Sequence, residues 1–352
     1  MRLAFAPYNL IFKEPGGTSR GVMTTKSTYF IKIWDEANPQ KFGIGEAAIF
    51  RGLSAEDNNS YELKLIETLS NVALGIPTDL SHYSSIKFGL EQAIYDYSNG
   101  ARGIYFPSEF VNGNKSITIN GLIWMGEYDE MIRRIDEKIK SGFHCLKLKI
   151  GAIDFLKEID MIKYIRSYYS ASTLEIRVDA NGGFNMDNII NALNILAKYD
   201  IHSIEQPIKQ GQWELMKFLC QISPLPIALD EELIGISSID KKKALLETIQ
   251  PEYIILKPAL CGGFSGAEEW IKLANERDIK WWVTSALESN IGLNAIAQWV
   301  ATLKTDMPQG LGTGGVFKNN FHTPIFLDNE KLKYDNRIVI DYSQFENLEW
   351  RM

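Results

Sequence analysis

The chain has 352 residues, of which 45% are hydrophobic and 23% are charged, and its formal net charge is -7. These values match an ordinary globular protein with one large domain or two, and they argue against a disordered chain. The acidic balance and the lack of a basic stripe argue against a nucleic-acid partner. The three cysteines lack paired spacing, which predicts neither disulfides nor a zinc site, so we expect a cytoplasmic protein. No segment approaches the length of a membrane span, so we expect no membrane partner.

The first part of the sequence, residues 1–113, has the pattern of an α+β domain. Alternating apolar residues predict two paired strands within 27–50, and helical spacing follows over 84–100. The glycine-rich stretch 13–22 has no period, so we expect a mobile loop there. Residues 325–352 lack the repeat that precedes them, and we expect them to pack back on this first domain.

Residues 114–324 repeat a pattern of strand followed by helix. Short apolar runs alternate with amphipathic runs that have helical spacing. The repeat predicts an α/β fold, a (β/α)₈ barrel of roughly 200 residues. An open, doubly wound sheet is the alternative, but no GxGxxG motif follows any of the first seven expected strands. The expected strands lie within 116–124, 144–150, 174–180, 201–207, 226–232, 252–260, 280–289 and, more weakly, 306–314.

Ionisable side chains recur at the ends of the middle strands. The C-terminal strand ends of a barrel form its active-site face, so we expect these side chains to lie near one another. Residues two apart on a strand share a face, which places Lys147 beside Lys149 and Arg177 beside Asp179. Each residue alone also fits a solvated side chain or a helix cap, and only the joint pattern points to a site. The residues are Lys147, Lys149, Arg177, Asp179, Asn181, Glu205, Asp230, Glu231 and Lys257.

Carboxylates from three consecutive strands would converge in such a barrel. They cannot do so unpaired, because mutual repulsion would force at least one of them to take up a proton. A divalent cation removes this conflict. Oxygen ligands suit Mg²⁺ or Mn²⁺ better than Zn²⁺, and the sequence has neither an HxxxH motif nor a cysteine cluster. We therefore expect Mg²⁺, with Mn²⁺ as the alternative metal.

Beside such a metal, the two lysines of the strand within 144–150 could act as bases. Burial and like charge both lower the pKa of a lysine, and a neutral lysine is a base. Lys257, on the other side of the metal, could serve as a second base, an acid or a cation over developing charge. Removal of a proton next to a carboxylate creates an enediolate, which a metal and a nearby ammonium stabilise. The pattern therefore predicts proton abstraction from a small carboxylate substrate.

These residues resemble the motifs of the enolase superfamily, and in particular of its muconate-lactonising subgroup. The resemblance covers nearly the whole chain, because GIGEAA at 43–48 and the helix beginning at Phe88 are similar to that superfamily's capping domain. It implies a (β/α) barrel with an α+β capping domain that is built from the N-terminal part and the C-terminal tail. The barrel motifs are KxK at 147–149, DAN at 179–181, EQP at 205–207, DE at 230–231 and KP at 257–258.

The resemblance also implies roles for the lysines and the carboxylates. Lys149 would be the base, and Lys257 would be its partner on the opposite face. Lys147 would contact the substrate carboxylate or tune its neighbour. The family places the metal ligand first in the DE pair, which disfavours Glu231. The implied Mg²⁺ ligands are Asp179, Glu205 and Asp230.

Further candidates for substrate contact come from the loops and strand ends. The stretch 16–21 is similar to the family's mobile loop, which closes over the substrate and would exclude water from it. Other candidates share a face with the metal ligands or follow the later strands. The full set is Ser19, Arg20, Arg177, Asn181, Gly262, Ser285 and Thr313.

Three further stretches, 119–126, 284–292 and 310–320, resemble the o-succinylbenzoate synthases within that subgroup. Such enzymes dehydrate 2-succinyl-6-hydroxy-2,4-cyclohexadiene-1-carboxylate to 2-succinylbenzoate on the route to menaquinone. The alternative enzyme is an N-succinylamino-acid racemase, because the same metal and lysines serve both reactions, or another enzyme similar to muconate cycloisomerase. A barrel that only binds a metal or a metabolite is the alternative without catalysis, and the retained lysines and carboxylates argue against it. The aromatic content is compatible with a homo-oligomer.

Overall fold

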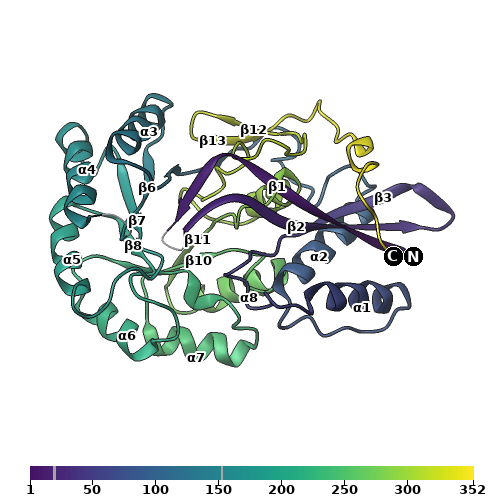
Figure 1. Cartoon of the computed structure of the whole chain (residues 1–352), viewed down its shortest axis with the longest axis horizontal. Helices are drawn as coiled ribbons and strands as arrows, with labels where there is room; N and C mark the ends of the chain where they lie inside the picture. Colours follow the sequence, from purple (N-terminus) through teal and green to yellow (C-terminus); the bar gives the residue numbers. More distant parts are fainter. Residues whose placement is uncertain (19–20, 152–153) are drawn as a thin grey trace.

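The computed structural model describes residues 1–18, 21–151 and 154–352. An antiparallel sheet with two helices lies beside a curled parallel sheet that is ringed by helices (Figure 1). This arrangement confirms the predicted (β/α) barrel with an α+β capping domain. The two chain termini lie next to each other at the capping-domain end (Figure 1). The exact domain boundaries at 113 and 324 stay predictions.

The capping domain begins with a long hairpin. β1 (Arg2–Thr18) pairs antiparallel with β2 (Gly21–Asp35), and β2 pairs antiparallel with β3 (Asn38–Ala47). The prediction of a loop over 13–22 is wrong for the described part of that stretch, which forms the two arms of the hairpin. Backbone pairing of residues 16–18 with residues 21–23 extends the hairpin through this stretch, and such pairing requires no apolar period in the side chains.

Two helices, α1 (Tyr61–Ala73) and α2 (Ser84–Ser98), follow the sheet of the capping domain. Glycines let α2 lie directly against β3. A Cβ atom on Gly45 would overlap the carbonyl oxygen of Gly89, and one on Gly89 would lie 2.6 Å from the backbone nitrogen of Ala47. Helix and strand therefore approach more closely than side chains at these positions would allow.

Substitution Gly45→Ala should destabilise the capping domain. The new methyl group would push α2 away from β3, at a cost of about 1–3 kcal/mol or more in the free energy of unfolding. Chemical denaturation of the variant measures this loss. Gly315→Ala is the matched control, because a Cβ atom there meets nothing within 4 Å. An unchanged denaturation midpoint for Gly45→Ala would contradict the close approach of helix and strand.

In the described part of the chain, seven parallel strands form one curled sheet in the order β11-β10-β9-β8-β7-β6-β5. Isolated parallel bridges join its two edges, with Thr284 paired to Gly310 and Ile119 paired to Gln309. The weakly predicted eighth strand is present only as this short link, in which Pro308 has no N–H group to donate. The strands are β5 (Gly121–Ile123), β6 (Cys145–Lys149), β7 (Glu175–Asp179), β8 (Ser203–Glu205), β9 (Ile227–Leu229), β10 (Tyr253–Leu256) and β11 (Lys280–Val283).

Helices cover the outside of the parallel sheet, and most of them return the chain to the next strand (Figure 1). Their buried apolar faces form one large core with the sheet. Among the described residues, no helix is long and apolar enough to cross a membrane. The helices are α3 (Tyr128–Lys140), α4 (Phe155–Tyr168), α5 (Ile189–Leu196), α6 (Trp213–Ile222), α7 (Ile239–Ile249), α8 (Gly263–Asn275) and α9 (Asn290–Thr302), with 3₁₀ turns η1 (Ala197–Tyr199) and η2 (Glu231–Leu233).

The C-terminal tail divides between the two parts of the molecule. A hairpin of β12 (Ile325–Asp328) and β13 (Lys331–Tyr334) pairs with β4 (Ile117–Thr118), which precedes the first barrel strand. The residues after it, including the turn η3 (Tyr342–Phe345), pack on the capping domain, where Arg351 pairs with Phe5 through backbone hydrogen bonds of 2.8 and 2.9 Å.

Candidate active site

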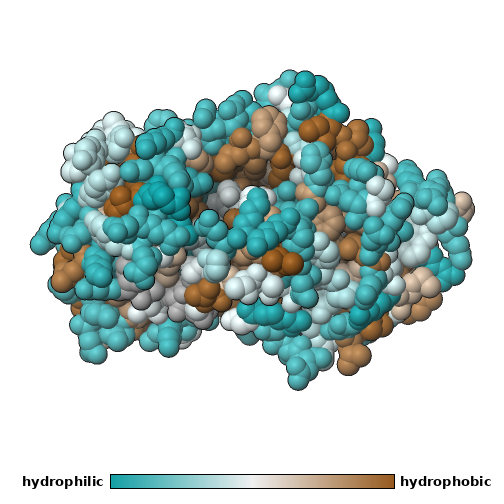
Figure 2. Space-filling model, turned by 45° about the horizontal axis from the view of Figure 1, so that its top comes forward, coloured by the Kyte–Doolittle hydropathy of each residue, from teal (hydrophilic) through white to brown (hydrophobic). Residues whose placement is uncertain are grey.

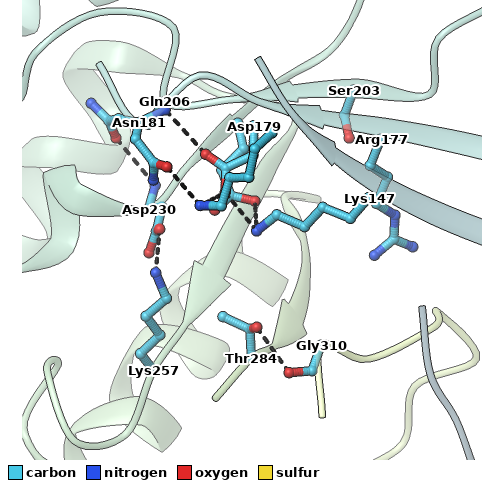
Figure 3. A network of polar contacts seen from close by, with 12 residues as sticks. Lys147, Arg177, Asp179, Asn181, Ser203, Gln206, Asp230, Lys257, Thr284 and Gly310 are labelled. Carbon is cyan, nitrogen blue, oxygen red and sulfur yellow. Dashed lines mark hydrogen bonds and ion pairs between the residues drawn. The ribbon is translucent and has the colours of Figure 1, made fainter. Parts of the chain in front are cut away.

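The register of the parallel sheet brings a lysine and two carboxylates side by side. Lys149, Asp179 and Glu205 are the last residues of β6, β7 and β8, and the ladder pairs each with the next. Residues in register on parallel strands point to the same face, and neighbouring strands lie about 4.8 Å apart. Asp230 and Lys257 directly follow β9 and β10. The predicted residues thus lie at the C-terminal ends of five consecutive strands. Figure 3 shows Asp179, Asp230 and Lys257 of this set.

The two lysines of β6 share one carboxylate, that of Asp179. Lys147 Nζ lies 2.9 Å from Asp179 Oδ2 and 2.5 Å from Glu205 Oε2. Lys149 Nζ lies 2.6 Å from Asp179 Oδ2 and 2.6 Å from Asn181 Oδ1. Lys147, Asp179 and Glu205 are buried, whereas Lys149 keeps partial exposure. Lys149 is therefore the more accessible of the two amines.

Lys257 reaches the cluster from the other side of the barrel. Its ammonium pairs with Asp230, and the two side chains point at each other (Figure 3). The side-chain nitrogen of Asn181 donates a hydrogen bond of 2.9 Å to Glu231 Oε1, which fixes the amide that also faces Lys149. The structure thereby brings Asn181 into the cluster, and its contact with a substrate stays a prediction.

The charges within the cluster hold two of its lysines as ammonium ions. Burial lowers the pKa of Lys147, but Asp179 and Glu205 outweigh burial, so its pKa lies above the ordinary value. Burial also opposes a rise at Lys257, where Asp230 raises the pKa above the ordinary value. Burial and like charge predict lowered pKa values for such lysines. That expectation does not hold for Lys147, because direct contact with two carboxylates exceeds the repulsion between neighbouring lysines.

Within the described ranges of the chain, no three His, Cys, Asp or Glu side chains are already arranged to hold a metal ion. The donor set nevertheless fits a hard divalent cation. Burial and the charge of Asp179 raise the pKa of Glu205 well above its usual range. Glu205 Oε1 is buried and has no hydrogen-bond partner in the described part of the chain. A cation would offset the repulsion between the two neighbouring buried carboxylates. Carboxylate oxygens are ligands that Mg²⁺ accepts.

A cavity opens above the cluster, and residues from both parts of the molecule line it. Figure 2 shows a largely hydrophilic face with apolar side chains gathered around a hollow near its middle. An apolar wall with a few polar groups suits a small ring-bearing compound whose charge is bound at the base of the cavity. The lining comprises Met23, Phe50, Leu53, Asn120, Leu122, Trp124, Lys147, Lys149, Asn181, Lys257, Leu260, Thr284, Ser285, Ala286, Leu287, Gly310, Gly312 and Thr313.

Two of the predicted substrate contacts meet on one wall of this cavity. The hydroxyl group of Thr313 donates a hydrogen bond of 2.8 Å to Ser285 Oγ, and both residues line the cavity. Gly262 instead precedes α8 with a left-handed φ of 100° and lines a different cavity. The remaining candidates, Ser19 and Arg20, lie outside the described residues.

Arg177 does not reach the cavity, although it shares a strand face with Asp179. Its Nε donates a hydrogen bond of 2.7 Å to Glu175 Oε1, and its guanidinium lies 4.3 Å from the centre of the Trp282 ring. In Figure 3 the guanidinium is turned away from the carboxylates. Two residues along a strand span about 6–7 Å, so Arg177 lies one layer deeper in the barrel than Asp179. Arg177 is therefore not among the residues that line this cavity, and its contact with a substrate stays a prediction.

Gln206 is a positioning residue that the sequence did not single out. Its backbone has a left-handed φ of 39° directly after Glu205, and its side-chain oxygen accepts a hydrogen bond of 3.2 Å from the backbone nitrogen of Asp230. It also donates to Glu232 Oε2 at 3.0 Å. The EQP motif contains this glutamine, but its partners lie 24 and 26 residues away, where no local pattern reveals them.

Comparisons with known proteins agree with this geometry. The family described as "Enolase C-terminal domain-like" matches residues 130–330. The o-succinylbenzoate synthase of Desulfotalea psychrophila is 44% identical over 363 aligned residues, which cover 93% of this chain and 97% of that protein. The crystal structure of MenC from the same organism has a TM-score of 0.81 at 40% identity, covering 95% and 99% of the two chains.

More distant structures share the fold alone. A dipeptide epimerase from Cytophaga hutchinsonii, solved with Mg and the dipeptide D-Ala-L-Val, has a TM-score of 0.83 at 21% identity. The match covers 99% of this chain and 98% of that one. The matched family covers more than half of the sequence, and the 44% identity extends over nearly all of it. The chain therefore belongs to the o-succinylbenzoate synthase family of the enolase superfamily.

Proposed function

We propose that this chain dehydrates 2-succinyl-6-hydroxy-2,4-cyclohexadiene-1-carboxylate to 2-succinylbenzoate. One observation carries the proposal: Lys149 and Lys257 approach three converging carboxylates from opposite sides, beneath a small cavity. The arrangement occurs in a chain that is 44% identical to an o-succinylbenzoate synthase. Two amines on opposite sides of a bound carboxylate suit a reaction that first removes a proton and then expels a leaving group.

Lys149 acts as the base in this proposal. In its neutral form it takes the ring proton from the carbon that carries the carboxylate, and the electron pair moves toward that carboxylate. The pair then returns into the ring as the bond to the hydroxyl group breaks. Water is lost in total, as one proton and one hydroxide, and the ring becomes aromatic. The partial exposure of Lys149 in the cavity suits contact with substrate.

Lys257 acts as a cation that balances the negative charge developing on the substrate carboxylate. Its ammonium is held in the cluster by Asp230. Lys147 is tied to Asp179 and Glu205, so it orients these carboxylates. Members of the enolase superfamily generally depend on Mg²⁺. Bound by Asp179, Glu205 and Asp230, Mg²⁺ would supply a Lewis acid for the substrate carboxylate.

The cavity and the cysteines support two further parts of the proposal. Apolar side chains from the capping domain, Met23 and Phe50, cover the cluster and would exclude water from the charged transition state. Cys145, Cys220 and Cys261 are all free thiols. Unpaired cysteines suit a reducing compartment, which supports a place in the cytoplasm.

The test is turnover of the proposed substrate by the full chain with Mg²⁺. We expect the ultraviolet absorbance of the cyclohexadiene to fall as 2-succinylbenzoate forms, with water as the other product. A folded, Mg²⁺-loaded chain that leaves the diene unchanged would contradict the substrate. Exchange of the α-proton of an N-succinyl amino acid in D₂O would then identify the racemase instead.

A further inference from the structure

A buried carboxylate of the capping domain reaches into the barrel. Glu46 lies near the end of β3 and is fully buried. The side chain of Gln92 on α2 holds its backbone, because Glu46 N donates a hydrogen bond of 3.2 Å to Gln92 Oε1 and Glu46 O accepts one of 3.2 Å from Gln92 Nε2. The hydroxyl group of Thr28 on β2 donates a hydrogen bond of 2.9 Å to Glu46 Oε1. Contacts within the capping domain therefore fix the position of this carboxylate.

The carboxylate of Glu46 caps the barrel helix α9. Its Oε1 accepts a hydrogen bond of 3.0 Å from the backbone nitrogen of Ser289. Its Oε2 accepts hydrogen bonds of 2.6 Å from the hydroxyl group of Ser289 and 3.0 Å from the backbone nitrogen of Gly292. A Cβ atom on Gly292 would lie 2.8 Å from Glu46 Oε2, so the glycine leaves room for this contact. A helix N-terminus favours a carboxylate, and these three bonds join the start of α9 to the capping domain.

The segment between β11 and α9 forms part of the cavity wall and contains an unusual turn. Ser285, Ala286 and Leu287 all line the cavity. Leu287 has a φ of 62°, in the left-handed region that residues with a side chain rarely adopt. Two hydrogen bonds hold the turn, from Leu287 N to Ser285 Oγ at 2.9 Å and from Ala286 N to Glu288 Oε2 at 2.8 Å. A strained turn of this kind persists only where its surroundings hold it.

Both ends of this turn are anchored. Its N-terminal end follows β11 in the parallel sheet, and its C-terminal end is Ser289, which is bonded to Glu46. Release of Ser289 would let the backbone at Leu287 relax toward a less strained conformation. The hydroxyl group of Thr313 donates a hydrogen bond of 2.8 Å to Ser285 Oγ, so a shift of the turn would also displace this part of the wall.

We propose that Glu46 is a positioning residue for substrate binding: by holding Ser289, it keeps the turn at 285–288 in the conformation that forms the cavity wall. The inference rests on the proposed function for the identity of the substrate. On the capping-domain side, the chain continues from Glu46 to Phe50, which also lines the cavity. Glu46 therefore fixes a cavity wall from the barrel relative to a cavity wall from the capping domain.

The first variant is Glu46→Gln. Glutamine has nearly the same shape, but only one of its two terminal atoms can accept a hydrogen bond, so it cannot accept from both Ser289 and Gly292 as the carboxylate does. We expect the KM for the cyclohexadiene to rise about tenfold, whereas kcat stays within about threefold, because the reacting cluster is untouched and only binding is weakened. A folded Glu46→Gln with the wild-type KM would overturn the proposal.

Asp96→Asn is the matched control. Asp96 on α2 is also a buried carboxylate of the capping domain, and it accepts hydrogen bonds from backbone nitrogens. The donors are Ile44, Arg102 and Gly103, at 2.9, 3.0 and 2.7 Å, and these residues do not line the cavity. The control should lower the stability of the capping domain and leave KM within about twofold of the wild-type value. An equal rise of KM in both variants would assign the effect to general destabilisation and overturn the positioning role.

Ser289→Ala tests the same contact from the barrel side. It removes the hydroxyl group that donates to Glu46 Oε2 and leaves Glu46 unchanged. We expect KM to rise about threefold, and the double variant Glu46→Gln/Ser289→Ala to have a KM within about twofold of that of Glu46→Gln, because both changes weaken one contact. An unchanged KM in Ser289→Ala, or effects that multiply in the double variant, would overturn the proposal. Ser289→Ala alone decides the question if Glu46→Gln does not fold.

Hydrogen exchange gives a readout that needs no substrate. The amides of Ala286 and Leu287 do not bond to Glu46, but they donate within the turn that Ser289 anchors. We expect both to exchange faster in Glu46→Gln and in Ser289→Ala, and at the wild-type rate in Asp96→Asn. Failure of the wild-type chain to convert the diene would overturn the proposed function alone. Unchanged exchange at these two amides in Glu46→Gln would overturn the positioning role alone.

Discussion

Lys149→Ala should lower kcat for the cyclohexadiene carboxylate by about 10³-fold or more, because a positioned general base contributes about 10²–10⁴-fold. No other lysine of the cluster can replace it without moving. Lys147 is tied to both Asp179 and Glu205, and Lys257 is held by Asp230. The fall in diene absorbance under saturating substrate and Mg²⁺ measures kcat directly. Residual activity above about one tenth of the wild-type value would contradict the assignment of the base.

Arginine substitutions separate the roles of the two lysines. An arginine keeps the positive charge but cannot act as a base. Lys149→Arg should therefore lose about as much activity as Lys149→Ala. Lys257→Arg retains a cation near Asp230, and we expect it to keep at least about tenfold more activity than Lys149→Arg. The reverse order would assign the base to Lys257.

Chemical rescue provides a further control for Lys149→Ala. The truncated side chain leaves space in the cavity next to Asn181, and a small amine such as methylamine can occupy it. We expect added methylamine to restore part of the lost kcat in Lys149→Ala and to leave Lys149→Arg unchanged, since the arginine side chain fills that space. Equal thermal midpoints of the variants and the wild type would show that the loss is chemical.

The position of the cluster could be predicted from the sequence because it follows from strand geometry. Lys149, Asp179 and Glu205 each end a short apolar run, and a parallel sheet brings the ends of such runs into one row. The period of two residues then places Lys147 on the same face as Lys149. Both features can be read from local sequence patterns. The predicted fold class and the five predicted strand ends therefore agree with the structure.

Depth and long-range packing could not be predicted in the same way. Arg177 shares the face of Asp179, but the period does not show that its guanidinium packs against Trp282 and not into the cavity. Met23 and Phe50 belong to the capping domain, and they line the cavity only because that domain docks on the barrel. No local pattern therefore marks either of these two capping-domain residues as part of the site.

Glu205→Gln should lower Mg²⁺-dependent turnover by about 10³-fold, because a metal contributes several kcal/mol of charge stabilisation and each 1.36 kcal/mol is tenfold in rate. Glutamine has nearly the same shape as glutamate, and its oxygen can still accept a hydrogen bond from Lys147. The cluster should therefore keep its arrangement. The variant lacks one of the carboxylate charges that a hard cation requires.

Thermal unfolding with and without Mg²⁺ isolates metal binding from catalysis. Mg²⁺ at a hundred times its Kd should stabilise the wild type by about 2.7 kcal/mol, and chelation should remove that gain. Glu205→Gln should show a much smaller gain at the same concentration. Glu231→Gln is the matched control, because Glu231 lies beside Asp230 and contacts Asn181 at 2.9 Å without being an implied ligand.

The two variants together decide the ligand set. A full Mg²⁺ response in Glu205→Gln would remove Glu205 from the metal site. The lack of a hydrogen-bond partner for Glu205 Oε1 among the described residues would then need another explanation. A lost response in Glu231→Gln would move the third ligand from Asp230 to Glu231. Loss in Glu205→Gln alone is the expected result, because Glu205 shares Lys147 with Asp179 and so already lies where one cation can bind two carboxylates.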